Sequence, residues 1–470
     1  MTKTDCDILI RNGQLVTMDP ARTIYRPGAV AVRDRRIVDV GREADVTARV
    51  APDRTIDAGG GIVHPGFIDA HNHIVHTTCR GVFDGIHSVG AAPVNFATWK
   101  AGVTDADEAC ATRMAGLEML RSGFTMFIEP GSLFSTAAAA QAVEEVGMRA
   151  LFAPLYLWDR HETFEAIPAL AAPELMARAP IDQARCLEQL DAELHRNGDA
   201  DALVRGYVFV YGEGTATTEL LQAAHAVARE HGVPLHIHAG YLPGVAEVYR
   251  SLTGTGQVTH LQELGVLDAG TVIVHANALD DAEEAALRTS GCQVVWCPAA
   301  FLSLGIATAV PFRMAARHRA GVAIALGADG TFDGPPAETM RAARFVSQSY
   351  ADSLTPETLL EMQTLEAAAA AGMATELGSL EAGKRADIVI RNPAAAEAYP
   401  DNNPAHILAF NMGPGSVETV LVDGRIVLAD GRSTRVDEAR VYREVSGSVA
   451  ERAGRLGIDP GPAWPVVGDA

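Results

Sequence analysis

Residues 65–73 read Pro-Gly-Phe-Ile-Asp-Ala-His-Asn-His, a short apolar run that ends in two histidines one residue apart. Alternate residues of a β-strand point to the same side, so His71 and His73 are expected to face one side together. Functional residues of a parallel α/β barrel gather at the carboxyl ends of its strands. These nine residues therefore predict a barrel strand that carries two potential metal ligands to the barrel mouth.

The segments that follow have the alternation expected of such a barrel. Short apolar runs typical of buried strands alternate with amphipathic stretches typical of helices, such as 107–123 and 219–232. Roughly eight strand–helix units predict a closed (β/α)₈ barrel of the TIM type, an α/β fold. The expected strands lie within residues 61–73, 123–130, 149–156, 204–211, 234–240, 271–277, 292–298 and 322–329.

Both ends of the chain have a different, β-rich pattern. Alternating apolar residues separated by Gly and Asp turn signals occur at 7–18 and 28–41, and again at 384–392 and 416–431. We expect these segments to form one small β-sandwich domain. The predicted organisation is a composite sandwich of residues 1–64 and 376–436, a barrel of residues 65–375, and a C-terminal helix and tail of residues 437–470.

The composition is that of an acidic globular protein, with 38 Lys plus Arg, 59 Asp plus Glu and a net charge of −21. Such a surface repels nucleic-acid phosphates and anionic membranes. No long apolar window predicts a transmembrane helix, and the N-terminus has no signal-peptide pattern. Six scattered cysteines without a CxxC pair are typical of reduced core residues. We expect a cytoplasmic protein whose partners are small molecules.

Three more potential ligands end predicted strands: His238, His275 and Asp329. Imidazoles together with a carboxylate suit Zn²⁺ or a similar transition ion. Simpler interpretations exist for each, since His236 shares a strand face with His238, His275 could be a core histidine, and Asp329 could be a turn residue. Possible metal ligands occur at the ends of four predicted strands, in the order of the barrel, and this favours a metal site.

This order of ligands resembles the amidohydrolase superfamily. The resemblance rests on segments spread over nearly the whole chain, and it is greatest to the branch of chlorohydrolases and cytosine and guanine deaminases. The segments are PGFIDAHNH (65–73), AGLEMLRSGFT (115–125), HIHAG (236–240), GADG (327–330), LGSLEAGKRADIVI (377–390) and ETVLVDGRIVLADG (418–431).

The resemblance implies one divalent metal ion held by His71, His73, His238 and Asp329, with zinc the first expectation and iron, manganese or cobalt as alternatives. A bound ion lowers the pKa of its water from ~15.7 towards ~7 and so supplies hydroxide at neutral pH. Asp329 would take the proton of that water and pass it to the leaving group, and His275 would polarise the electrophilic oxygen or orient the hydroxide. No lysine occurs on the predicted fourth strand, which argues against a two-metal centre.

Three departures from the family pattern concern the substrate. The strand-five motif H-x-x-E, whose glutamate protonates a ring nitrogen in family deaminases, reads His-Ala-Gly-Tyr at 238–241, and a tyrosine with a pKa of ~10 is a poor proton donor at pH 7. Ala300 and Phe301 replace the polar residues of a P-x-S-N motif, and 210–215 read VYGEGT in place of a G-P-H segment. These changes predict a less polar pocket.

Amides, ureas and carbamates need no ring protonation, so the leading hypothesis is hydrolysis of a non-peptide carbon–nitrogen bond of that type in a fairly apolar substrate by metal-bound hydroxide. The alternative is an aminohydrolase, a deaminase or dechlorinase, of an N-heterocycle. An alternative of another class is a decayed barrel that only binds a ligand. The relatives imply a homodimer or higher homo-oligomer.

Several other side chains are weaker candidates. Tyr241, Phe301 and Trp99 are expected to contact the substrate, although each could equally belong to the core. Trp158 and Phe332 could line the pocket or pack in the core. Glu129 and Glu213 end predicted strands and are expected to be structural, and His76 and His87 to be loop residues.

Overall fold

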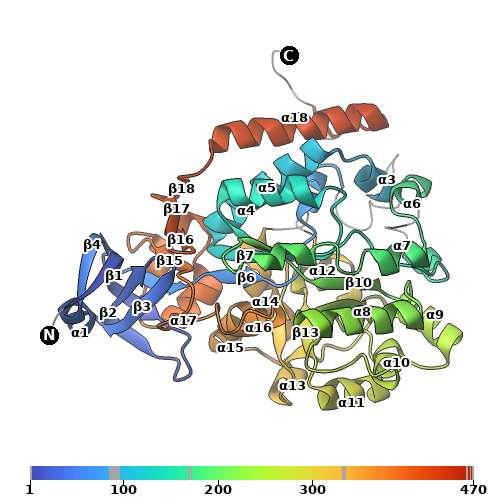
Figure 1. Ribbon diagram of the computed structural model, residues 1–470, viewed down its shortest axis with the longest axis horizontal. Helices are drawn as coiled ribbons and strands as arrows, with labels where there is room; N and C mark the ends of the chain where they lie inside the picture. Colours follow the sequence, from blue (N-terminus) through green and yellow to red (C-terminus); the bar gives the residue numbers. More distant parts are fainter. Residues whose placement is uncertain are drawn as a thin grey trace.

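The structure, a computed structural model, describes residues 3–83, 96–167, 170, 172–330, 335–461, 464, 465 and 467. Within these residues the chain forms a parallel barrel wrapped by helices, a β-rich region beside it, and a long C-terminal helix (Figure 1). No helix in the described part of the chain is long and apolar enough to span a membrane.

The barrel consists of parallel strands in two hydrogen-bonded sheets, ordered β6-β7-β8-β9 and β10-β11-β12-β13-β14. Only Tyr207 separates β9 from β10, and its N–H donates to the carbonyl oxygen of Phe152 at 3.1 Å, so the two are one continuous strand. The strands are β6 (Phe67–Asp69), β7 (Phe124–Glu129), β8 (Arg149–Phe152), β9 (Val204–Gly206), β10 (Val208–Gly212), β11 (Leu235–Ala239), β12 (Thr271–His275), β13 (Gln293–Trp296) and β14 (Ile324–Leu326).

The ring closes between its first and last strands. The N–H of Ala70 donates to Leu326 at 3.0 Å, and Asn72 forms a parallel bridge with Asp329. Eight strands therefore close into a cylinder, which confirms the predicted (β/α)₈ fold. Closure also brings the end of β6 against the end of β14, and so places His71 and His73, which directly follow β6, beside Asp329.

Helices pack around the outside of the barrel, and their ends follow the capping residues of the sequence. Helix α4 (Asp105–Ser122) begins at a capping box formed by Thr104 and Asp107 and ends at Gly123, whose φ of +90° is left-handed. A Cβ at Gly123 would lie 2.5 Å from the guanidinium of Arg391, so this turn into β7 requires glycine.

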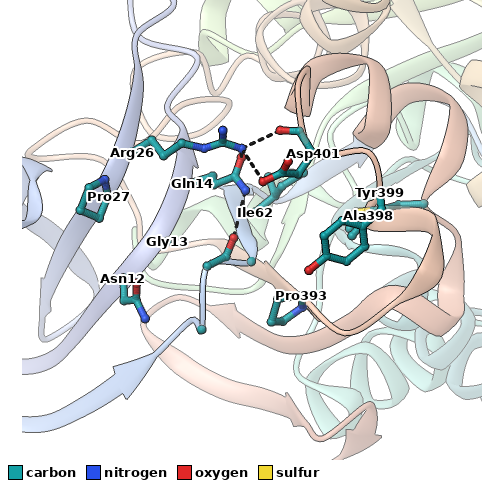
Figure 2. A pocket seen from close by; sticks show the side chains of 14 residues that line it. Asn12, Gly13, Gln14, Arg26, Pro27, Ile62, Pro393, Ala398, Tyr399 and Asp401 are labelled. Atoms are coloured by element: carbon teal, nitrogen blue, oxygen red, sulfur yellow. Dashed lines mark hydrogen bonds and ion pairs between the residues drawn. The ribbon is translucent and has the colours of Figure 1, made fainter.

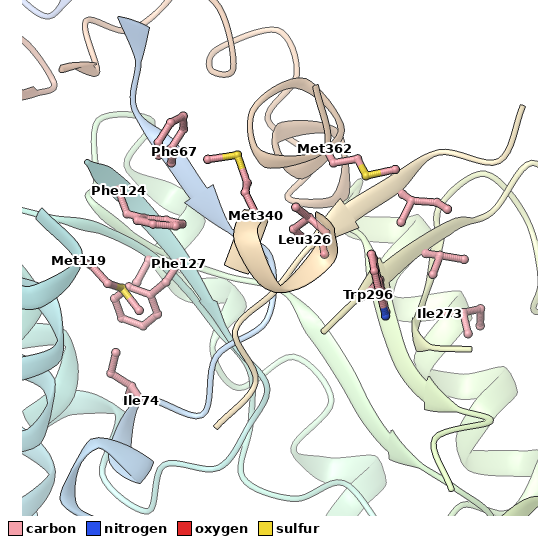
Figure 3. Close-up of a cluster of buried hydrophobic side chains, with 14 of the residues drawn as sticks. Phe67, Ile74, Met119, Phe124, Phe127, Ile273, Trp296, Leu326, Met340 and Met362 are labelled. Atoms are coloured by element: carbon pink, nitrogen blue, oxygen red, sulfur yellow. The ribbon is translucent and has the colours of Figure 1, made fainter. Parts of the chain in front are cut away.

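The remaining helices of the barrel region are α3 (Phe96–Ala101), α5 (Thr136–Val146), α6 (Pro173–Arg178), α7 (Gln183–Glu188), α8 (Thr218–His231), α9 (Pro243–Thr253), α10 (Gln257–Glu263), α11 (Asp281–Ser290), α12 (Pro298–Ser303), α13 (Met314–Arg319), α14 (Thr339–Ser349), α15 (Pro356–Gln363) and α16 (Leu365–Ala370). The core between strands and helices is apolar and buried. Figure 3 shows part of it, with Phe124 and Phe127 near Met119, Phe67 beside Met340, and Trp296 near Leu326.

The β-rich region draws strands from both ends of the chain, as the sequence predicts. Its strands are hydrogen-bonded into one nine-stranded sheet, and the two packed layers of a sandwich remain a prediction. Its order is β18-β17-β16-β15-β5-β1-β2-β3, with β4 paired to β1, and the two chain ends meet where β15 runs antiparallel to β5. The strands are β1 (Thr4–Val16), β2 (Ile24–Arg33), β3 (Arg36–Arg42), β4 (Val50–Asp57), β5 (Ile62–Pro65), β15 (Ile388–Arg391), β16 (Val417–Val422), β17 (Arg425–Ala429) and β18 (Arg432–Ser433), with the short helices α1 (Glu43–Arg49) and α17 (Pro404–His406) beside them.

Buried charges join this sheet to the barrel. Arg149 of β8 donates to Asp387 at 3.0 Å and to Asp423 at 2.6 Å, and all three side chains are at most 5% exposed. Helix α18 (Glu438–Leu456) lies across α4, where Arg455 pairs with Asp107 at 3.4 Å (Figure 1).

Candidate active site

A cavity at the carboxyl ends of the barrel strands contains most of the predicted functional residues. Its lining combines titratable side chains with an apolar wall made by Ile167, Leu242 and Val245. The polar lining residues are His73, Tyr211, Glu213, His238, Tyr241, His275 and Asp329. The site is therefore built from residues more than 250 positions apart in the sequence.

The turn after β6 is held in place from both sides. Asp329 donates its backbone N–H to His71 at 2.8 Å and accepts the N–H of His73 at 2.9 Å. Asp69, whose side chain is buried, accepts from the Asn72 side chain at 2.8 Å and from the N–H of Ala328 at 3.0 Å. Asp69 thus fastens the histidine pair to the Asp329 loop, a positioning role that sequence analysis missed although the residue lies inside the PGFIDAHNH segment.

His238 of β11 points one ring nitrogen into the site. Its Nδ1–H donates to the carbonyl oxygen of Tyr211 at 2.8 Å, and its Nε2 lies 3.2 Å from Nε2 of His71. A hydrogen bond from the far nitrogen to a carbonyl is the usual way that proteins fix a metal-binding imidazole. The rival His236 lies deeper in the barrel, where its Nε2–H donates to Ala370 at 2.8 Å.

Asp329 and His275 close the cluster from β14 and β12. Nε2 of His73 lies 3.6 Å from Oδ1 of Asp329, and Nε2 of His71 lies 3.9 Å from it. His275 and Asp329 have positive φ angles of +79° and +60°, which non-glycine residues adopt at a cost of about 1–3 kcal/mol. Such strained residues concentrate at functional sites.

Possible ligand atoms in this cluster lie close enough to share one ion. They fall within 4.8 Å of one another in three overlapping groups, namely His71 with His238 and His275, His71 with His73 and Asp329, and His275 with Cys297 and Asp329. Burial lowers the pKa of each of these histidines far below its usual value, so the imidazoles are neutral. Neutral imidazoles and a carboxylate are donors that suit a divalent transition ion.

Tyr241 occupies the place of the family glutamate and contacts two residues of the cluster. Its ring stacks on His275 with the centroids 3.7 Å apart, and its hydroxyl donates to Oδ2 of Asp329 at 3.0 Å. Burial and the nearby carboxylate raise the pKa of Tyr241 well above its usual value. The phenol is therefore a hydrogen-bond donor to Asp329 and does not release its proton at neutral pH.

Glu213 also lines the cavity, which the sequence did not predict. Burial raises the pKa of its carboxyl group to about 8. One carboxyl oxygen accepts the backbone N–H of Tyr241 at 2.9 Å. The unusual VYGEGT segment that contains Glu213 was the one available signal.

Two residues expected to contact the substrate lie elsewhere. Trp99 is 1% exposed and packs with Phe83 and Phe96, and Phe301 is 2% exposed and packs against Trp296. Neither belongs to the described lining of this cavity, because the tertiary packing of α3 and α12 turns both rings into the core. The positions of Trp99 and Phe301 therefore do not support the prediction that these two rings contact the substrate.

The remaining candidates also fall outside the lining. Trp158 is buried, stacks on Tyr156 and donates to Ala179 at 3.0 Å. Both carboxyl oxygens of Glu129 accept hydrogen bonds from Ser132. His76 is buried with its ring stacked 4.8 Å from that of His73, so it is closer to the cluster than a loop histidine would be. Phe332 and His87 lie outside the described residues.

A larger cavity of about 430 Å³ lies where β1, β2 and the start of β5 meet the segment 393–412 (Figure 2). It shares no lining residue with the cavity of the histidine cluster. Its charged groups already pair with one another, because Arg26 donates to the Asp401 carboxylate at 3.2 Å. No histidine or cysteine is among its described lining residues. The chemistry is therefore concentrated in the barrel.

Comparison with known proteins agrees with this architecture. The model of the Amidohydrolase family matches residues 62–427. A 5-methylthioadenosine/S-adenosylhomocysteine deaminase of Symbiobacterium thermophilum is 30% identical over 96% of this chain and 99% of its own length. A 5'-deoxyadenosine deaminase of Methanosarcina mazei is 27% identical over 96% of this chain and 99% of its own length.

Solved structures have the same fold. An adenosine deaminase of Xanthomonas campestris with bound zinc superposes with a TM-score of 0.82 at 25% identity, covering 97% of this chain and all of the other. The atrazine chlorohydrolase of Arthrobacter aurescens complexed with zinc has a TM-score of 0.78 at 21% identity, covering 94% of this chain and all of the other. The chain belongs to the amidohydrolase family, and it is a hydrolytic enzyme that acts on carbon–nitrogen bonds.

Proposed function

We propose that His71, His73, His238 and Asp329 hold one divalent metal ion, zinc in the first instance. The proposal is supported by the closeness of the His71, His73 and Asp329 ligand atoms and by Nε2 of His238, which lies 3.2 Å from Nε2 of His71. It is also supported by the neutral state of the buried imidazoles and by the hydrogen bond that turns Nε2 of His238 into the site. A divalent ion bound there would supply hydroxide near neutral pH by lowering the pKa of a water from ~15.7 towards ~7.

Asp329 is the proposed proton carrier. Its carboxylate takes the proton released when water attacks the carbonyl-type carbon, and then gives that proton to the leaving nitrogen as the carbon–nitrogen bond breaks. The Tyr241 hydroxyl, 3.0 Å from Oδ2, holds this carboxylate in one orientation. His275, buried at the end of β12, is placed to polarise the oxygen of the scissile group.

The proposed substrate is a small, fairly apolar amide, urea or carbamate. The observation that carries this choice is Tyr241, which fills the position of the family glutamate and whose hydroxyl donates a hydrogen bond to Asp329. Without that glutamate, the usual protonation of an aromatic ring nitrogen has no donor at strand five. The apolar wall of Ile167, Leu242 and Val245 suits such a substrate.

A second candidate is an aminohydrolase of an N-heterocycle. It is favoured by the names of the relatives, which are deaminases of adenosine derivatives and cover nearly the whole chain. It is also favoured by the buried carboxyl group of Glu213 in the cavity, which could replace the missing acid.

Product analysis separates the two candidates. Zinc-loaded enzyme is incubated with phenylurea, an anilide and an aryl carbamate, and separately with adenosine, 5'-methylthioadenosine and an aminotriazine. Amine release from the first group, with no ammonia from the second, is the expected result. Ammonia from the heterocycles alone contradicts the amide-type proposal, and the absence of both stoichiometric metal and turnover contradicts an enzyme altogether.

A further inference from the structure

The turn after β10 has a geometry that a merely connecting loop does not need. Gly212, Glu213 and Gly214 have φ angles of +74°, +50° and +78°. Left-handed backbone is strained for glutamate, so surrounding contacts must hold it there. A Cβ on Gly212 would lie 2.1 Å from the carbonyl oxygen of His238, which shows how tightly this turn presses against the end of β11.

Glu213 uses one half of its carboxyl group to hold the neighbouring turn. Its backbone N–H donates to the carbonyl oxygen of His238 at 3.0 Å, and its Oε1 accepts the N–H of Tyr241 at 2.9 Å. The side chain is 3% exposed, and Oε2 has no hydrogen-bond partner among the described residues. One carboxyl oxygen is thus satisfied and the other is open in a buried cavity.

A purely structural role does not account for the open oxygen. A buried polar atom without a partner costs about 1–3 kcal/mol, and the contact to Tyr241 needs only one oxygen. Glu129 is the useful comparison, because it also ends a barrel strand and is fully buried. Both of its oxygens bond to Ser132, and it does not line the cavity. Among the described residues that line this cavity, Glu213 alone has a carboxyl oxygen without a hydrogen-bond partner.

We propose that Glu213 contacts the substrate directly, and that Oε2 hydrogen-bonds the nitrogen side of the scissile bond. This inference rests on the proposed function, and it narrows the substrate to compounds with an N–H or ring nitrogen next to the carbon under attack. From the β14 and β12 side, Asp329 would carry the proton from the attacking water to the leaving nitrogen and His275 would polarise the oxygen. Glu213 would hold the nitrogen from the β10 side.

The test is Glu213→Gln in the zinc-loaded, full-length enzyme, with Glu129→Gln as the matched control. Glutamine keeps an oxygen for the Tyr241 N–H, so the turn and the melting temperature should be preserved. Its amide can neither offer a second acceptor oxygen nor carry an acidic proton. We expect kcat/KM with phenylurea, an anilide or adenosine to fall at least tenfold in Glu213→Gln and to stay within twofold in Glu129→Gln.

The outcomes separate this inference from the proposed function. A kcat/KM within twofold of wild type in Glu213→Gln, at equal metal content, overturns the inference and leaves the function in place. Loss of ammonia release from adenosine, with no urea turnover in the wild type, supports Glu213 and contradicts the amide-type proposal. A wild type that turns over neither class contradicts both. If Glu213→Gln does not fold, Glu213→Asp, which keeps both oxygens on a shorter stem, is compared for its separate effects on kcat and KM.

Discussion

Removing one hydroxyl group, by the substitution Tyr241→Phe, tests how the carboxylate of Asp329 is oriented. Phenylalanine keeps the ring that stacks 3.7 Å from His275, so neither the packing nor the metal content should change. What is lost is the 3.0 Å hydrogen bond to Oδ2 of Asp329. A hydrogen bond to a charged group contributes about 1.5–3 kcal/mol, and each ~1.4 kcal/mol changes a rate tenfold.

The expected result is therefore a fall in kcat/KM of roughly 10- to 150-fold. The assay is steady-state release of amine or ammonia from the best substrate, with zinc measured in the same preparations. Tyr249→Phe is the control, because it removes a hydroxyl bonded to His260 at 2.7 Å outside the cavity. A Tyr241→Phe enzyme with wild-type kcat/KM would refute the view that this phenol positions the proton carrier.

Three further predictions concern the proton carrier, the junction with the β-rich region, and acid stability. Asp329→Asn should lower kcat by about 10²- to 10⁴-fold with an unchanged circular dichroism spectrum, because an amide cannot carry the proton; retention of most activity would contradict this role. Arg149→Met leaves Asp387 and Asp423 buried beside an apolar side chain and should cost about 3–5 kcal/mol in urea unfolding, whereas a cost below 1 kcal/mol would mean that the network relaxes freely. Burial holds the pKa of His64 well below its usual value, so below pH ~6.5 the unfolded chain binds a proton that the folded chain does not. The free energy of unfolding therefore falls as pH falls, by at most about 1.4 kcal/mol per pH unit from this residue. In His64→Gln, the free energy of unfolding should depend less steeply on pH between about pH 7 and 5.

The barrel was predictable because its signals are local. Each strand is a short apolar run. A residue such as Gly123, whose left-handed backbone suits glycine, marks where a helix ends. The joining of the two chain ends in one β-rich region was also predictable, since the same alternating pattern occurs at both ends. The pairing of β5 with β15 was not, because residues 61–73 were predicted as a single barrel strand and the structure divides them between β5 and β6. The predicted domain boundaries remain predictions.

The candidate site was predictable only in part. His238 and His275 lie at the ends of β11 and β12, while His71, His73 and Asp329 follow the ends of β6 and β14. Barrel closure brings these strand ends together at one edge. Glu213 could not be predicted with equal force, because its position depends on a left-handed turn that no periodic pattern indicates. The substrate contacts of Trp99 and Phe301 remain predictions. Both rings are buried, and sequence alone does not indicate which way the helix that carries such a ring is turned in the packed protein.

The most direct test is metal analysis of the purified enzyme together with His71→Ala and His238→Ala. We expect one equivalent of zinc per chain in the wild type. Its X-ray absorption fine structure should show nitrogen and oxygen neighbours and no sulfur. Each variant should lose both the metal and turnover. Full zinc occupancy in both variants, or a wild type that takes up no stoichiometric ion, would contradict a shared metal site at the end of these strands.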